Sequence, residues 1–187
     1  KVTGLGSAAN SPGEQFPLIT PPVAQVSAPS LAGNNTIDPG VYHWGPGPLT
    51  FPNDSSLVPT SSGVVTIYVT GNVTIGENVT LGSHPGTNLR IIMKSDASLQ
   101  STLGADMATF DAKKDFIFHG GLYGRNTNVR IGDDSRIYGS IIGRTVYLKS
   151  QSDKKVQLHY DQAMVASQVC GAAKYVALRG TWREIIP

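Results

Sequence analysis

The sequence predicts an all-β fold, a single-domain right-handed β-helix (β-solenoid) with a proline-rich N-terminal arm and a C-terminal cap. Six-residue units of one pattern occur in two separate regions, as NVTIGE and NVTLGS at 72–83 and as NVRIGD and DSRIYG at 128–139. Alternating apolar positions turn one side of each short strand inward, and the Gly, Asn or Asp after it lets the backbone turn a corner. Such repetition is typical of coiled strands. The right-handed sense is expected from the general chirality of protein chains.

Composition supports one β-rich core. The chain has 187 residues, of which 40% are hydrophobic, enough for one domain. With 21 Gly, 12 Pro and only 15% charged residues, it is rich in turns rather than in helix. The formal net charge is +2 and the basic residues are scattered, so we expect no nucleic-acid partner.

Residues 1–35 are predicted to form an extended arm. Prolines such as Pro12, Pro17 and Pro29 interrupt every candidate helix in this segment. Its apolar residues suit a strand that runs along the side of the coil. Residues 36–187 then form the solenoid domain with its C-terminal cap.

Short strands are predicted at the start of the solenoid domain. Pro39-Gly40 places a turn between two of them, typical of a hairpin or a corner. The runs VVTIYV at 64–69 and LRIIMK at 89–94 are rich in β-branched residues, which favours strands.

A recurring offset predicts the pitch of the coil. Ile92 follows Ile75 by seventeen residues, and Val146 follows Val129 by the same number. Ile131 and Leu148 repeat that offset. We therefore expect turns of roughly seventeen residues, stacked about 4.8 Å apart.

The chain changes character after residue 160. Residues 162–174 favour a short helix or a loop, and YVAL at 175–178 favours a last strand. We expect this region to cover the end of the coil, because an open end would offer unpaired backbone groups.

Four segments in the second half of the chain resemble a known family. They are FHGGLYGRNTNV at 118–129, IYGSIIGRTV at 137–146, HYDQA at 159–163 and TWREI at 181–185. Their order is similar to that in the β-helical C-terminal domain of bacterial type IV pilus assembly proteins of the minor-pilin type. In that family a hydrophobe-Tyr-Gly strand motif, here around Tyr138, precedes a His-Tyr-Asp segment and a Trp-Arg-Glu triplet near the chain end. The resemblance covers residues 36–186 and is best from 116 onward.

The resemblance implies a non-catalytic, extracellular domain at the bacterial cell surface. Its partners would be other pilus or filament subunits. The family's hydrophobic N-terminal helix is not found in this sequence, and three alternatives stay open: it was removed, it was omitted, or a separate helical subunit supplies it. Since the chain opens on Lys1, we expect a membrane anchor or export signal to lie upstream, or an anchor to come from a partner. The resemblance implies no catalytic residues, and we expect no cofactor and no metal.

Structural roles are favoured for the candidate residues in the His-Tyr-Asp segment. His159 and Asp161 suit acid-base or metal chemistry by residue type. In a strand, however, both point to one side and Tyr160 to the other. A buried Tyr160 beside a hydrogen bond between His159 and Asp161 explains the triplet without catalysis.

The triplet near the chain end has two interpretations. Trp182, Arg183 and Glu184 suit an exposed recognition patch, because Trp and Arg are enriched in interface hot spots. The favoured interpretation is a cap, in which Trp182 covers the apolar end of the coil and Arg183 pairs with a carboxylate.

Two ligand-binding alternatives remain open. Asp133 and Asp134, with Asp153 about one turn later, carry oxygens that suit calcium, although solvated turn aspartates are favoured. A polysaccharide is the second ligand, for an adhesin or a polysaccharide-active enzyme. The aromatic residues available to stack on sugars are Trp44, Tyr123, Tyr138, Tyr147 and Tyr160.

Overall fold

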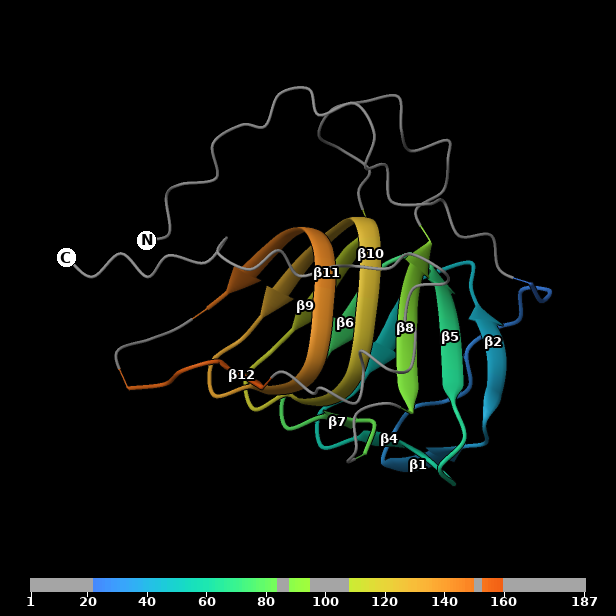
Figure 1. Ribbon diagram of the computed structural model, residues 1–187, viewed down its shortest axis with the longest axis horizontal. Helices are drawn as coiled ribbons and strands as arrows, with labels where there is room; N and C mark the ends of the chain where they lie inside the picture. The colour runs from blue at the N-terminus through green and yellow to red at the C-terminus, as the bar shows by residue number, and fades with distance from the viewer. Residues whose placement is uncertain (1–21, 84–87, 95–107, 150–152, 160–187) are drawn as a thin grey trace, which may run out of the picture.

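All regular structure in the described part of the chain is β-strand. The computed structural model describes residues 22–83, 88–94, 108–149 and 153–159, in which twelve strands pair in parallel (Figure 1). The strands are β1 (Asn34–Ile37), β2 (Gly40–Trp44), β3 (Leu49–Phe51), β4 (Ser56–Pro59), β5 (Val65–Thr70), β6 (Val73–Ile75), β7 (Thr80–Leu81), β8 (Leu89–Lys94), β9 (Thr109–Ala112), β10 (Ile117–Ile131), β11 (Arg136–Leu148) and β12 (Gln157–His159). The predicted all-β class is confirmed, since these ranges contain no helix.

The strands wind into about five turns of a solenoid with three faces. On the first face, β1, β4 and β7 are followed by the beginnings of β10 and β11 and then by β12. The second face stacks β2, β5 and β8 against the middle of β10 and β11. The third face stacks β3, β6 and β9 against their ends. This arrangement confirms the predicted β-solenoid, with β1 and β2 at one end and β11 and β12 at the other (Figure 1).

Alternate side chains of each strand fill the interior. In β5 the inward residues Val65, Ile67 and Val69 are fully buried, whereas the residues between them are partly exposed. Ile67 lies in register with Tyr42 on one neighbouring strand and Ile91 on the other. Burial of one such aliphatic side chain stabilises the fold by about 1.5–3 kcal/mol. The core is therefore a stack of apolar layers that continues from turn to turn.

The predicted pitch is confirmed on the third face late in the chain. Val129 of β10 lies opposite Val146 of β11, and Ile131 lies opposite Leu148. Both pairs are seventeen residues apart. The offset of seventeen therefore measures one turn only on this face, because the same two strands pair at an offset of nineteen on the first and second faces.

The same offset is wrong for Ile75 and Ile92. Ile75 lies on the third face opposite Phe51 and Ala112, whereas Ile92 lies on the second face opposite Tyr68. Between them the chain passes through β7 on the first face, so seventeen residues do not complete the turn there. The residue that lies opposite Ile75 one turn later is Ala112 of β9, thirty-seven residues further along the chain.

The six-residue units bend around one corner of the coil rather than stack on each other. NVTIGE contains β6 on the third face, and NVTLGS contains β7 on the first. The corner between them includes Asn78, which has a φ of 56°. Pro39-Gly40 likewise forms a corner and no hairpin, because β1 and β2 belong to different faces.

The described end of the N-terminal arm lies against the first turn. Val26 forms a parallel bridge with Trp44, and its backbone N–H donates to the carbonyl of His43. Leu31 belongs to the buried core, and Ala28 packs against it. This part of the arm covers the end of the coil, and β1 begins at Asn34, within the segment predicted as the arm. Residues 1–21 and the predicted cap, with its helix or loop and last strand, lie outside the described residues.

Candidate functional site

The structure brings two of the predicted site residues together on the first face. Tyr138 of β11 lies in register between His119 of β10 and His159 of β12. The rings of His119 and Tyr138 are stacked, with centroids 4.5 Å apart and planes 5° apart. The rings of Tyr138 and His159 are 4.7 Å and 10° apart. The three side chains form one ring column across three turns.

His159 lies on the outer side of β12, which is compatible with the predicted alternation of His159 and Tyr160 along the strand. Its side chain is exposed, and its Nε2 lies 3.3 Å from the Oε1 of Gln157 on the same strand. Tyr160 and Asp161 lie outside the described residues, as do Trp182, Arg183 and Glu184. The proposed hydrogen bond between His159 and Asp161 therefore stays a prediction.

The ring column is suited to holding the turns in register. Offset or parallel aromatic stacking contributes about 0.5–1.5 kcal/mol per pair beyond buried area. Both faces of the Tyr138 ring are occupied by the two histidine rings, so this ring offers no free face for a ligand to stack on. The two histidines are separated by the full thickness of the Tyr138 ring, too far to act on one metal ion.

Sequence reasoning did not single out His119. A signal was available, because Phe118-His119, Ile137-Tyr138 and Leu158-His159 repeat an apolar-ring pair. Their spacings of nineteen and twenty-one residues depart from seventeen, and this hid the match. The first and third faces therefore have different offsets between the same two strands.

A polar corner joins the third face to the first and repeats four times in the described residues. Asp54, Asn78, Asp115 and Asp134 all have left-handed backbones there, with φ between 56° and 58°. Asp and Asn adopt this conformation more readily than other residues with a side chain. Their side chains also join turns, since Asn78 Nδ2 donates to Asp54 Oδ1 at 2.8 Å. The corner is thus one conformation stacked four times.

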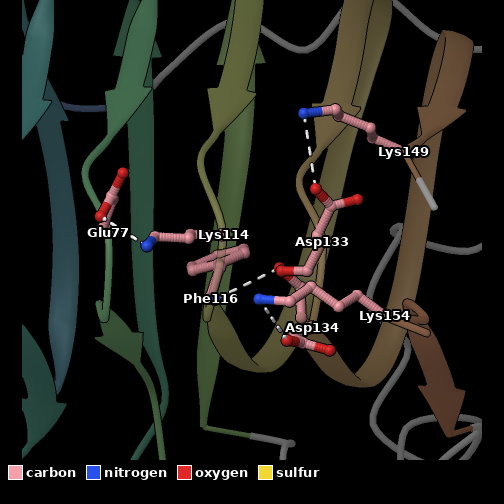
Figure 2. Close-up of polar contacts among 8 residues, drawn as sticks. Glu77, Lys114, Phe116, Asp133, Asp134, Lys149 and Lys154 are labelled. Atoms are coloured by element: carbon pink, nitrogen blue, oxygen red, sulfur yellow. Dashed lines mark hydrogen bonds and ion pairs between the residues drawn. The ribbon is translucent and has the colours of Figure 1, made fainter. Parts of the chain in front are cut away.

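Ion pairs connect successive turns along this corner (Figure 2). The Nζ of Lys114 lies 3.2 Å from the Oε2 of Glu77, and each of the two side chains is about half exposed to solvent. The hydrogen bond to Glu77, and then the attraction to the same carboxylate, raises the pKa of Lys114 above its ordinary value.

The aspartates weighed as calcium ligands face lysines. The Nζ of Lys149 lies 3.4 Å from the Oδ2 of Asp133, and the Nζ of Lys154 lies 3.4 Å from the Oδ2 of Asp134 (Figure 2). Within the described ranges no three His, Cys, Asp or Glu side chains gather as metal ligands would. The backbone N–H of Phe116 donates to the Ser135 hydroxyl at 3.2 Å, which ties the same corner together. A structural role accounts for these contacts.

Apolar side chains are exposed at the last described turns. Val146, Leu148 and Leu158 align with the inward residues Val129, Ile131 and Ile137. These three earlier residues are buried, but Val146 is 43% exposed, Leu148 36% and Leu158 58%. Positions that belong to the core in earlier turns therefore lie open here.

The residues weighed for sugar stacking do not share one surface. Trp44 and Tyr123 are buried, which is a correction to their suggested use as stacking faces. Tyr138 belongs to the ring column, and Tyr160 lies outside the described residues. Tyr147 is 61% exposed on the third face, so its ring is open to a ligand.

The comparisons with known proteins gave one family match. A family model described as Domain of unknown function (DUF7305) matches residues 46–166 of the 187. The searches of curated proteins and of solved structures found no match. Within the described ranges, no helix is long and apolar enough to span a membrane.

Proposed function

The chain belongs to the DUF7305 family, and we propose that it is a non-catalytic structural subunit of an extracellular filament of the type IV pilus class at the bacterial cell surface. The observation that carries this proposal is the open apolar edge formed by β11 and β12. The four sequence segments similar to minor-pilin-type proteins support the choice of filament. The function is to present this edge and the solenoid faces to neighbouring subunits.

The edge offers both backbone and side-chain contacts. β11 pairs with β12 through Arg136, Ile137 and Tyr138 alone among the described residues. Residues 139–148 of β11 therefore face no described strand on the side away from β10. Exposed strand edges accept an added strand through main-chain hydrogen bonds, and alternate side chains then supply specificity.

The partner that fits this edge is an extended segment of a neighbouring filament subunit. Added in parallel beside β11, it would continue the third face by one strand. Apolar residues at alternate positions of the segment would cover Val146 and Leu148, now 43% and 36% exposed. Covering such positions removes apolar surface from water at about 25 cal/mol per Å².

Immunogold electron microscopy of cells that make the protein tests this proposal. We expect regular label along surface filaments for the parent chain. A Val146→Lys variant should lose filament label, because a charge at a covered apolar position disfavours docking. A Val41→Lys variant is the matched control, since Val41 is 45% exposed on β2 at the opposite end.

Two results would contradict the proposal. Label spread over the cell wall or released to the medium would exclude a filament subunit. A large loss of thermal stability in purified Val146→Lys, comparable to a core substitution, would show that the chain's own residues cover the edge. In that case the subunit interface does not lie there.

A further inference from the structure

We propose that a depression on the third face binds an acidic sugar unit of a polysaccharide. Its volume is about 370 Å³, and its lining includes Asp111, Arg130, Tyr147 and Lys149. The four side chains come from β9, β10, β11 and the residue after β11. This binding activity is distinct from filament assembly although both involve β11, because the depression uses the outward side chains of the third face, whereas a docked strand would pair with the backbone edge of β11 and cover the inward residues Val146 and Leu148.

The depression follows from the register of the outward side chains. Asp111, Arg130 and Tyr147 occupy the same outward position on three successive turns. Two positions further along, Gly132 lies between Lys113 and Lys149 and has no side chain to fill the space. A Cβ on Gly132 would come within 2.5 Å of the Lys113 carbonyl carbon, so the close approach of these turns requires glycine.

The lining has the chemistry that recognises a sugar with a carboxylate. The exposed Tyr147 ring offers an apolar surface for the C–H face of a sugar ring. Arg130 is exposed and forms no ion pair with an acidic residue of the described ranges, so its guanidinium can bind a ligand carboxylate through two hydrogen bonds. Asp111 is exposed and can accept hydrogen bonds from sugar hydroxyls.

The charges favour an anion over a neutral sugar. Lys149 already lies 3.4 Å from Asp133, which holds its ammonium group at the rim and offsets part of its charge. Lys113 lies beside Gly132 and is also exposed, so three cationic side chains (Lys113, Arg130 and Lys149) surround the depression against two carboxylates, those of Asp111 and Asp133. Glycoside hydrolysis uses a pair of carboxylates, whereas Asp111 is the one carboxylate among the lining side chains, so the lining supports binding rather than cleavage.

The row of outward polar residues on the third face extends beyond the depression and suits a chain of sugars. Thr74 lies in register with Asp111, and Thr50 lies in register with Thr74. Their exposed hydroxyls continue this row over two more turns, spaced about 4.8 Å apart. A polysaccharide can therefore run across the turns with one acidic unit at Arg130.

Binding of defined oligosaccharides to the purified chain, measured by titration calorimetry, tests this proposal. We expect oligogalacturonate to bind and an uncharged dextran oligomer to bind much more weakly. Tyr147→Ala should weaken binding about tenfold, as expected for the loss of one stacked aromatic ring. Arg130→Gln should weaken binding by a similar factor and reduce its dependence on salt.

Matched substitutions on the first face serve as controls. Tyr138→Ala and Arg136→Gln change the same residue types on β11 and should leave binding unchanged. Tyr147→Phe should retain most of the affinity, because the ring remains. Circular dichroism melts of every variant separate loss of the site from loss of the fold.

Several outcomes would overturn the proposal. They are absence of oligogalacturonate binding, equal binding of dextran, and retention of affinity in both Tyr147→Ala and Arg130→Gln. Polyphosphate serves as a non-sugar anion. If it binds as tightly as oligogalacturonate and is insensitive to Tyr147→Ala, the surface is a general anion patch and the sugar assignment fails.

Discussion

The two ends of the described solenoid differ in how their apolar residues are covered. At the first turn, Leu31 and Trp44 are 4% and 3% exposed, and the arm bridges Trp44 through Val26. At the last turns, Val146 and Leu158 are 43% and 58% exposed. Each terminal turn has a neighbouring turn on one side alone, so the exposure of its apolar residues depends on what covers the other side. The arm covers the first turn, and no segment of the described ranges covers β11 beyond Tyr138 or β12.

Solenoid geometry explains why this difference matters. An inner turn such as β5 buries its apolar residues against neighbours on both sides, with β2 and β8 in register. A terminal turn has a neighbour on one side and depends on another segment for the rest. The arm meets this need at the first turn. At β12 the segment that covers the apolar residues is either the chain after His159 or a partner, and we propose the partner.

The largest expected effect comes from comparing one leucine at each end. Leu31→Ala should lower the free energy of unfolding by about 2–5 kcal/mol, as for buried leucines elsewhere. Leu158→Ala should change it by less than about 0.5 kcal/mol, as expected at an exposed site. Urea denaturation of the purified chain and both variants measures the two effects. Equal losses of unfolding free energy in the two variants would contradict the contrast between the ends, because Leu158 would then be covered by other residues of the chain.

The architecture was largely predictable from the sequence. Alternating apolar residues in the runs that became β5 and β8 are a direct consequence of burying every second side chain. The pitch was only partly predictable, because the seventeen-residue offset holds for Val129 and Val146 but not for Ile75 and Ile92. A fixed spacing cannot reveal which face a strand joins when corners and connections vary in length.

A smaller effect tests whether the corner is the same near both ends. Asp54 and Asp134 lie in early and late turns and share a φ of 56°. Alanine at either position loses the side-chain contacts and keeps the unfavourable left-handed backbone, whereas glycine loses only the contacts. We expect alanine to be less stable than glycine by about 1 kcal/mol at both positions, measured by urea denaturation.

Unequal results at the corner would change the comparison. If the difference between alanine and glycine appeared at Asp54 and not at Asp134, the late turn would be relaxing its backbone. The contrast between the ends would then extend to local conformation. If alanine and glycine differed in stability by the same amount at Asp54 and at Asp134, the two ends would differ only in how their apolar residues are covered.

The candidate surfaces were less predictable than the fold. Tyr138 and His159 were selected from a family resemblance, but their contact through stacked rings depends on a register that only the folded turns define. Arg130 lies in the NVRIGD unit and Tyr147 is one of the aromatic residues suited to sugar stacking, but neither pattern predicts that the two side chains meet. They meet because nineteen residues separate Asp111 from Arg130 and seventeen separate Arg130 from Tyr147. Unequal spacings of this kind are invisible to a search for one repeat.

The smallest expected effect lies between the two ends, at the ion pair of Lys114 and Glu77. Because folding raises the pKa of Lys114 above 10.5, its contribution to stability is fully present below that value and is lost as pH rises through the higher folded pKa. Lys114→Gln should therefore be less stable than the parent chain at pH 9, and the gap should narrow by pH 11. Urea midpoints at low salt measure this, with the exposed Lys113→Gln as the matched control. A gap that persists at pH 11 would assign the effect to packing of the lysine side chain rather than to its charge, and the corner would then hold its turns together by contacts that are independent of pH.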